Sequence, residues 1–131
     1  MFCGNFNTGS KRDVEKCLKG MSDVPNWQCV TPAKTCRRHM CVNTTGITVC
    51  NDNDHDITLR CDTIVREMAL NPAILCCTYG QGWKGISGQQ FTNEGWNVII
   101  SYANCNHPTD ERPSMGPPDE PWGPNGECKC C

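Results

Sequence analysis

The sequence has no long apolar run and no recognisable catalytic motif. No stretch approaches the roughly 20 apolar residues that a membrane-spanning helix needs, so we expect no transmembrane segment. A phosphate-binding loop, a GxSxG turn and an HExxH zinc pair are also missing. The histidines lie in separate segments, at His39, His55 and His107. We therefore expect no catalytic residue, no metal and no cofactor, and the net charge of −2 gives no reason to expect nucleic acid as a partner.

Cysteine, by contrast, is abundant. Thirteen of the 131 residues are cysteine, a density typical of short secreted chains that disulfide bonds hold together. A reducing cytosol would leave so many thiols free or bound to metal. We therefore predict a secreted, extracellular protein. The cysteines predicted to form disulfide bonds are Cys3, Cys17, Cys29, Cys36, Cys41, Cys50, Cys61, Cys76, Cys77, Cys105, Cys128 and Cys130.

An odd number of cysteines leaves one without an internal partner. We expect a monomer, with a dimer linked through the odd cysteine as the alternative. The connectivity cannot be deduced from the sequence. Adjacent residues on a strand point to opposite faces, so one of Cys76 and Cys77 is expected to bond toward a helix, where Cys17 and Cys61 are the candidates.

The N-terminus and one sequon agree with secretion. We interpret Met1 as an initiator placed before a mature chain whose signal peptide has been removed. Asn43-Thr44-Thr45 is an N-glycosylation sequon, which makes Asn43 a candidate glycosylation site.

Helical periodicity occurs in two segments. The first helix is expected to begin at Ser10, with Asp13 completing a capping box, and its apolar stripe consists of Val14, Cys17, Leu18 and Met21. After a polar loop, Asp54 or Asp56 is expected to cap a second helix, which should end at Asn71 before a proline. Its apolar face consists of Ile57, Cys61, Ile64, Val65 and Met68.

Strands are predicted in four places: residues 27–30, a hairpin of 40–43 with 47–50, residues 74–79, and residues 96–102. Both alternating sets in 96–102 are partly apolar, so this strand should be central and covered on both faces. We predict an α+β fold, a disulfide-rich sandwich of a mostly antiparallel sheet of about five strands with two helices on one face. Residues 1–105 should form one domain and residues 106–131 a proline-rich tail tethered by cysteines.

Candidate partner contacts come from charge and aromaticity. Lys34, Arg37 and Arg38 flank a cysteine in a predicted loop, where a disulfide would present their charges to an acidic surface at low entropic cost. Trp83 lies in a glycine-rich segment and is the fourth candidate. The alternatives are a solvated loop for the cations and a packing role for the tryptophan.

The order of elements between Cys41 and Cys105 carries a family resemblance. A hairpin ends at Cys50, a helix carries Cys61, the cysteine pair and a glycine-rich loop follow, and a last strand ends in Tyr102-Ala-Asn-Cys. This order resembles the killer-protein-four-like family of secreted fungal toxins. The resemblance implies an α/β sandwich and a protein that acts from outside the cell by blocking calcium entry. The adjacent cysteine pair departs from the family, where the pair is more often spaced.

The N-terminal segment carries a second resemblance. Cys3-Gly4, Thr8-Gly9-Ser10 and the residues before Cys17 are similar to the start of the necrosis-inducing secreted effectors of plant-pathogenic fungi. We therefore expect a fungal toxin or plant-interaction effector, not an enzyme, that binds a protein on the surface of a target or host cell. Two alternatives stay open. One is a secreted hydrolase or ribonuclease, because spacing alone does not reveal paired carboxylates. The other is a cell-wall glycan-binding protein that uses Trp83, Trp96 or Trp122.

Overall fold

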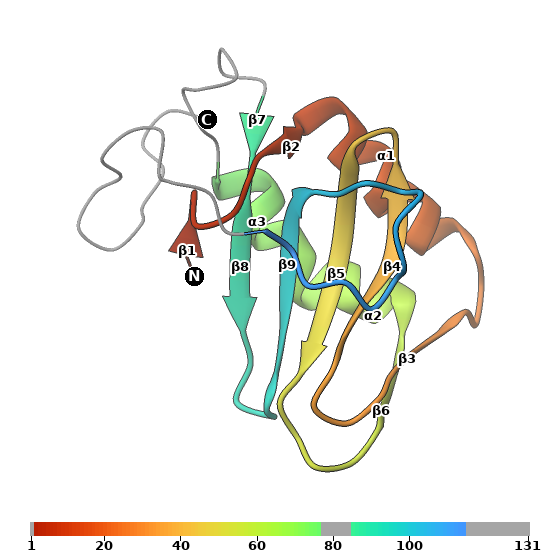
Figure 1. Cartoon of the computed structure of the whole chain (residues 1–131). Helices are drawn as coiled ribbons and strands as arrows, with labels where there is room; N and C mark the ends of the chain where they lie inside the picture. Colours follow the sequence, from red (N-terminus) through yellow and green to blue (C-terminus); the bar gives the residue numbers. More distant parts are fainter. Residues whose placement is uncertain (1, 77–84, 115–131) are drawn as a thin grey trace.

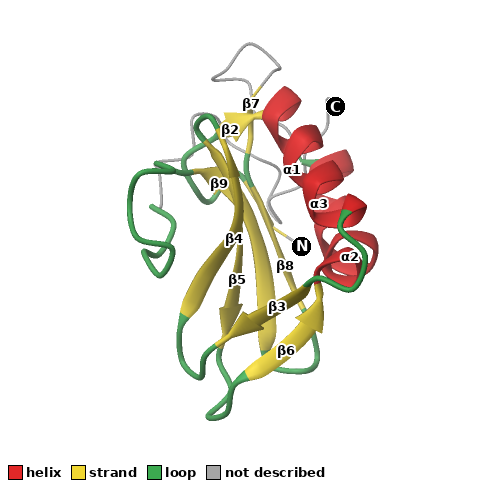
Figure 2. Ribbon diagram, turned by 90° about the vertical axis from the view of Figure 1, so that its right-hand side faces the viewer, coloured by secondary structure: helices red, strands yellow, loops and turns green. Residues whose placement is uncertain are grey.

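The computed structural model describes residues 2–76 and 85–114, and these form a sheet with helices on one of its faces (Figures 1 and 2). The main sheet has five antiparallel strands in the order β1-β8-β9-β5-β4. In that order their bounds are Phe2–Cys3, Gly88–Phe91, Trp96–Tyr102, Thr45–Asn51 and Cys36–Val42. The predicted α+β fold is confirmed.

Two short antiparallel strand pairs and two helical segments complete the fold. Strand β2 (Gly9–Ser10) pairs with β7 (Gly85–Ile86), and β3 (Gln28–Thr31) pairs with β6 (Ile57–Arg60). The first helix is α1 (Lys11–Asp23). The second segment runs from α2 (Cys61–Ile64) through a π-helical turn, η1 (Val65–Ala69), into α3 (Leu70–Leu75). None of the helices in the described ranges is long and apolar enough to cross a membrane.

The main core lies between the sheet and the helices. Alternate residues of β5 and β9 face the helices, which places an aliphatic layer beneath α1 and α2. Its central members are Val14, Met21, Ile47, Val49, Ile64, Val98 and Ile100, all at most 1% exposed. Strand β9 is the middle strand of the sheet, and its residues from Trp96 to Ser101 are buried. The prediction of a central strand covered on both faces is confirmed.

The first helix and the hairpin also form at the predicted places, although the cap differs and β4 begins at Cys36, so the loop predicted around Arg37 and Arg38 is wrong. Ser10 directly precedes α1, but its side chain makes no capping hydrogen bond. Its backbone N–H donates instead to Thr45 Oγ1 at 2.8 Å, because β2 holds this residue against the start of β5. The helix therefore begins at the predicted place through a strand contact.

The predicted second helix is wrong at its start. Residues Ile57–Arg60 form β6, because they pair with β3 while Ile57 and Leu59 pack against the core. The helical segment begins at Cys61, so Asp54 and Asp56 cap nothing. The Asp56 carboxylate accepts a hydrogen bond from the Ala33 N–H at 2.9 Å and so ties two loops together.

The predicted end of this helix is also wrong. The helix continues through Pro72 to Leu75, so residues 74 and 75 are helical and not part of a strand. The π-helical turn of η1 precedes this proline, and its wider hydrogen-bond spacing accommodates a residue without an N–H. The remaining predicted strand residues, 77–79, lie outside the described residues.

Within residues 2–76 and 85–114, four disulfides join these elements: Cys3–Cys76, Cys29–Cys61, Cys36–Cys50 and Cys41–Cys105. The prediction for Cys17 is wrong, since its thiol is free and buried on the inner face of α1. Its Sγ lies 3.5 Å from the Thr45 carbonyl oxygen, and burial raises the pKa of this thiol to about 11.

The expected bridge between Cys61 and the 76–77 pair is also wrong, because Cys61 bonds with β3 and Cys76 bonds with β1. Cys76 follows the end of a helix, so the argument from strand alternation does not apply to it. The predicted disulfide cysteines Cys77, Cys128 and Cys130 lie outside the described residues.

Candidate functional site

The sheet face opposite the helices is partly covered by a segment that we call the strap, residues 103–114. Figure 1 shows it as the blue trace that crosses in front of β9, β5 and β4 and then returns toward β9. The Cys41–Cys105 disulfide fixes its start, and the Asn7 N–H donates to the Ser114 carbonyl at 3.0 Å near its end. Residues 106–114, which the sequence assigned to the tail, therefore pack on the domain.

Arg38 anchors the strap. Its side chain is 9% exposed, and its guanidinium donates to the carbonyl oxygens of Asn104 at 3.1 Å and His107 at 3.0 Å. Its backbone N–H donates to the Thr109 carbonyl at 2.7 Å. The prediction that Arg38 contacts a partner is wrong, because strand alternation directs it onto the sheet face beneath the strap. Arg37 is exposed, and among the described residues its guanidinium reaches only the Val30 carbonyl, at 3.3 Å.

Next to the strap, the same face carries a groove of about 400 Å³. Its lining consists of Phe6, Cys36, Cys50, Asp52, Gln89, Phe91, Asn97, Ile99, Arg112 and Pro113. Phe6, Ile99 and the Cys36–Cys50 disulfide form a buried apolar cluster. At the rim, Phe91 is 47% exposed and meets the ring of Phe2 edge to face, with 6.0 Å between the centroids.

An amide pair lies on the strands that line the groove. Asn97 is 3% exposed, and its Oδ1 accepts a hydrogen bond from Gln89 Nε2 at 2.9 Å. Among the described residues, nothing accepts a hydrogen bond from Asn97 Nδ2. The groove therefore has an available donor on a side chain that the fold holds almost completely buried.

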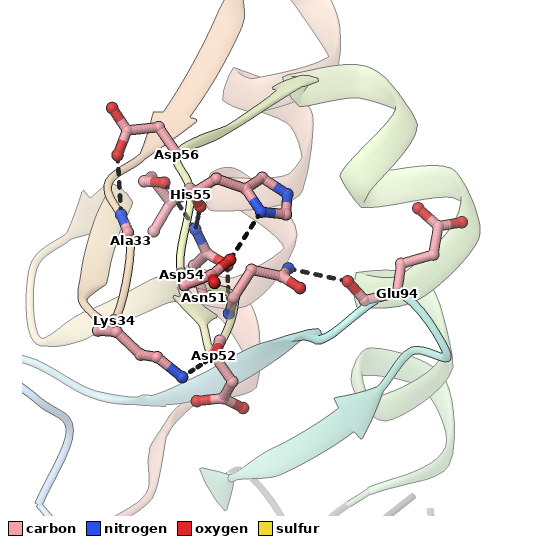
Figure 3. Close-up of polar contacts among 10 residues, drawn as sticks. Ala33, Lys34, Asn51, Asp52, Asp54, His55, Asp56 and Glu94 are labelled. Atoms are coloured by element: carbon pink, nitrogen blue, oxygen red, sulfur yellow. Dashed lines mark hydrogen bonds and ion pairs between the residues drawn. The ribbon is translucent and has the colours of Figure 1, made fainter.

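One end of the sheet carries a group of hydrogen-bonded loops that we call the loop platform, residues 32–35, 51–56 and 92–95 (Figure 3). Asn51 lies at its centre, and its amide donates to the carbonyls of Thr31 at 3.1 Å and His55 at 2.8 Å. The Asn53 amide donates to the Glu94 carbonyl at 2.9 Å and so ties the second loop to the third. The platform is therefore fixed before any partner arrives.

Lys34 belongs to the loop platform. Its N–H donates to the Asn53 carbonyl at 3.1 Å, and its ammonium donates to the Asp52 carbonyl at 2.6 Å. It is exposed, so its use as a partner contact stays a prediction. Asp52 lines the groove and also belongs to the platform, so the two features are continuous.

Exposed carboxylates dominate the charge of the loop platform: Asp52, Asp54, Asp56 and Glu94. The His55 ring lies 3.3 Å from the Asp54 carboxylate, and both side chains are mostly exposed. Within the described residues, no group of three or more histidine, cysteine or acidic side chains is arranged to hold a metal ion. The platform therefore presents negative charge to solvent.

The other predicted site residues lie apart from this end of the sheet. Asn43 is exposed in the turn between β4 and β5, and its amide donates to the Asp13 carboxylate at 3.0 Å. Trp96 is 7% exposed and packs in the core, so the expectation that it contacts a glycan is wrong. Trp83 and Trp122 lie outside the described residues.

Sequence reasoning missed the groove residues. The signal available was the alternation of Gln89 with Phe91 and of Asn97 with Ile99, which places each pair on one strand face. Comparisons of this chain with protein-family models, curated proteins and solved structures found no match.

Gly95 is expected to be indispensable for the loop platform. Its φ is +82°, and a Cβ at this position would lie 2.5 Å from Asn53 Oδ1. The left-handed backbone costs an alanine about 1–2 kcal/mol, and the clash adds to this. Gly95→Ala should therefore lower the free energy of unfolding in urea by at least that amount. Glu94→Ala is the control, and equal stability of the two variants would contradict the prediction.

His39 is expected to make stability depend on pH. Burial, followed by the charge of Arg37, lowers the pKa of this ring from 6.5 to about 4, so the folded protein holds it neutral. The unfolded chain binds the proton first as pH falls. The stabilisation is therefore fully present above pH 6.5 and is lost as pH decreases toward 4.

His39→Gln tests this pH dependence. Unfolding free energies measured between about pH 7 and about pH 4.5 should fall less in the variant than in the wild type. The glutamine can still bond with the Thr31 hydroxyl, which lies 3.0 Å from the His39 ring. Parallel pH profiles for the two proteins would show that His39 does not titrate in this way.

Proposed function

We propose that this chain is a secreted protein that acts outside the cell by binding its target through the groove and the loop platform. Four disulfides support an oxidising compartment, because they would not persist in a reducing cytosol. With the resemblances given above, this supports a killer-toxin-like or plant-interaction effector. We propose a protein on the surface of a target or host cell as its partner, and a block of calcium entry as its activity.

The observation that carries the proposal is the rigid loop platform beside an open groove. Its loops are tied by backbone and side-chain hydrogen bonds, while the Cys36–Cys50 disulfide joins the strands that begin and end beside it. A surface that is ordered before binding loses less conformational entropy when a partner docks. This smaller loss of conformational entropy favours a binding role for the platform.

The charge of the platform indicates what kind of partner surface fits. Its exposed acidic side chains outnumber Lys34, so a cationic patch on the target would be attracted and oriented. Such charges act mainly on the association rate, and salt screens them. Binding should therefore weaken as ionic strength rises.

Charge reversal tests the role of the platform. Asp54→Lys combined with Glu94→Lys should slow association of labelled protein with target cells about tenfold at low salt. Glu15→Lys combined with Glu67→Lys is the matched control, because these exposed carboxylates lie on the helices. Equal slowing by both pairs would contradict a docking role for the platform. Calcium uptake by the same cells tests the proposed block.

A further inference from the structure

The groove lies on the face of the sheet and not at its edge, which restricts what can bind there. Its strands β8, β9 and β5 pair with one another through continuous antiparallel ladders. The backbone groups of β9 and β5 are therefore occupied on both sides, and a peptide could not add a strand on this face. Recognition in the groove must come from side chains.

The polar side chains of the groove provide both donors and acceptors. Asn97 Nδ2 and the Arg112 guanidinium donate, the Asp52 carboxylate accepts, and the Gln89 amide can do both. Asn97 Nδ2 is not among the described polar atoms that are buried without a partner, so a ligand would displace water at this donor and should accept a hydrogen bond in its place. A hydroxyl group both donates and accepts, so it can satisfy each of these partners.

The apolar side chains supply a complementary surface. The ring of Phe91 is 47% exposed at the rim, and its edge-to-face contact with Phe2 holds it in place. Ile99 and Pro113 line the groove as well. An aromatic ring beside several hydrogen-bonding groups suits a molecule that has a flat C–H face and a polar edge, as a pyranose ring has.

We propose that the groove binds a neutral saccharide, as one or two pyranose rings stacked on Phe91 and hydrogen-bonded through Asn97, Gln89 and Asp52. The volume of about 400 Å³ is within the range of small-ligand pockets. This inference rests on the proposed function, since it states that the part of the target that enters the groove is carbohydrate. The source is either a wall polysaccharide or the glycan of a surface glycoprotein.

A titration of the full chain followed by ¹H–¹⁵N NMR tests the proposal. The probes are cellobiose, laminaribiose, diacetylchitobiose and mannobiose, each at up to about 10 mM, which is enough to detect a millimolar Kd. At least one should shift the resonances of Gln89, Phe91 and Asn97 in a saturable way. Cellobiose and laminaribiose represent wall glucans and mannobiose represents a protein glycan, whereas diacetylchitobiose is shared by chitin and the core of N-linked glycans. If no probe shifts these resonances, the proposal is wrong.

Two variants distinguish stacking in the groove from binding elsewhere. Phe91→Ala should weaken saccharide binding about tenfold or more. Asn97→Asp should also weaken saccharide binding, because it replaces the donor with an acceptor. Tyr102→Ala is the matched control, because Tyr102 is a 41% exposed aromatic residue of the same sheet that does not line the groove. If Tyr102→Ala weakens binding as much as Phe91→Ala, the groove is not the site.

The cell-binding assay separates this inference from the proposed function. Cell binding by a chain that binds none of the probes would overturn the saccharide proposal and leave the proposed function standing. Binding of a saccharide in the groove without association with any cell would support the inference and count against the proposed role. A cationic peptide that shifts the groove resonances when no saccharide does would identify a peptide ligand and overturn the proposal.

Discussion

Replacing both Cys3 and Cys76 by alanine is expected to lower the free energy of unfolding by about 4 kcal/mol. Among the disulfides of the described residues, theirs closes the longest loop, with a sequence separation of 73 residues. Its loss returns the largest amount of conformational entropy to the unfolded chain. The bridge also ties β1, a strand of two residues at the edge of the sheet, to the end of α3.

The Cys36–Cys50 disulfide provides the matched control. Its sequence separation is 14 residues, so the same entropic argument gives about 3 kcal/mol. These cysteines are opposite each other on β4 and β5, which the ladder already holds together. Urea denaturation of the two double-alanine variants should therefore find the Cys3/Cys76 variant less stable by at least about 1 kcal/mol. The reverse order would show that native-state contacts outweigh loop entropy here.

Elements with a strong local pattern could be predicted from the sequence. The hairpin of β4 and β5 has two apolar runs around a short turn, and α1 has an apolar stripe at helical spacing. The strand from Trp96 to Tyr102 was predicted as central because both of its faces are partly apolar. In each case a short window holds the information that determines the element.

Elements determined by distant partners could not be predicted in this way. Residues 57–60 fit the start of an amphipathic helix, yet they form β6 because they pair with β3 about 30 residues earlier in the chain. Pro72 favours a helix end locally, yet the preceding π-helical turn accommodates it. Tertiary pairing overrides the local preference in the first case and backbone geometry does so in the second.

In the candidate site, too, local patterns could be predicted from the sequence and the effects of distant partners could not. Alternation places Asn97 and Ile99 on one face of a strand, but it does not say which face lies away from the helices. The neighbours Arg37 and Arg38 look equivalent in the sequence, and only the position of the strap makes one exposed and the other buried. The strap carbonyls that bond with Arg38 lie 66 to 69 residues later in the chain, so no local pattern could separate the two arginines.

Arg38→Met is expected to release the strap from the sheet and to lower the free energy of unfolding by about 2–3 kcal/mol. The charged guanidinium donates to three strap carbonyls, those of Asn104, Cys105 and His107. Methionine keeps most of the apolar stem but donates no hydrogen bond. Because Arg112 and Pro113 of the strap line the groove, release of the strap should also weaken the binding of any ligand in the groove.

Arg37→Met is the matched control, because it removes the same charge from the adjacent exposed position. Its one hydrogen bond within the described part of the chain, to the Val30 carbonyl, is 3.3 Å long, so the loss should be at most about 0.5 kcal/mol. Thr48 and Ser101 lie beside the strap and are at most 2% exposed. Amide hydrogen exchange should become faster in the strap and at these two residues in the Arg38 variant only. The Cys41–Cys105 disulfide and the backbone hydrogen bonds to Thr109 and Ser114 persist in both variants. Slow exchange at Thr48 and Ser101 in Arg38→Met would therefore mean that these contacts hold the strap without the guanidinium.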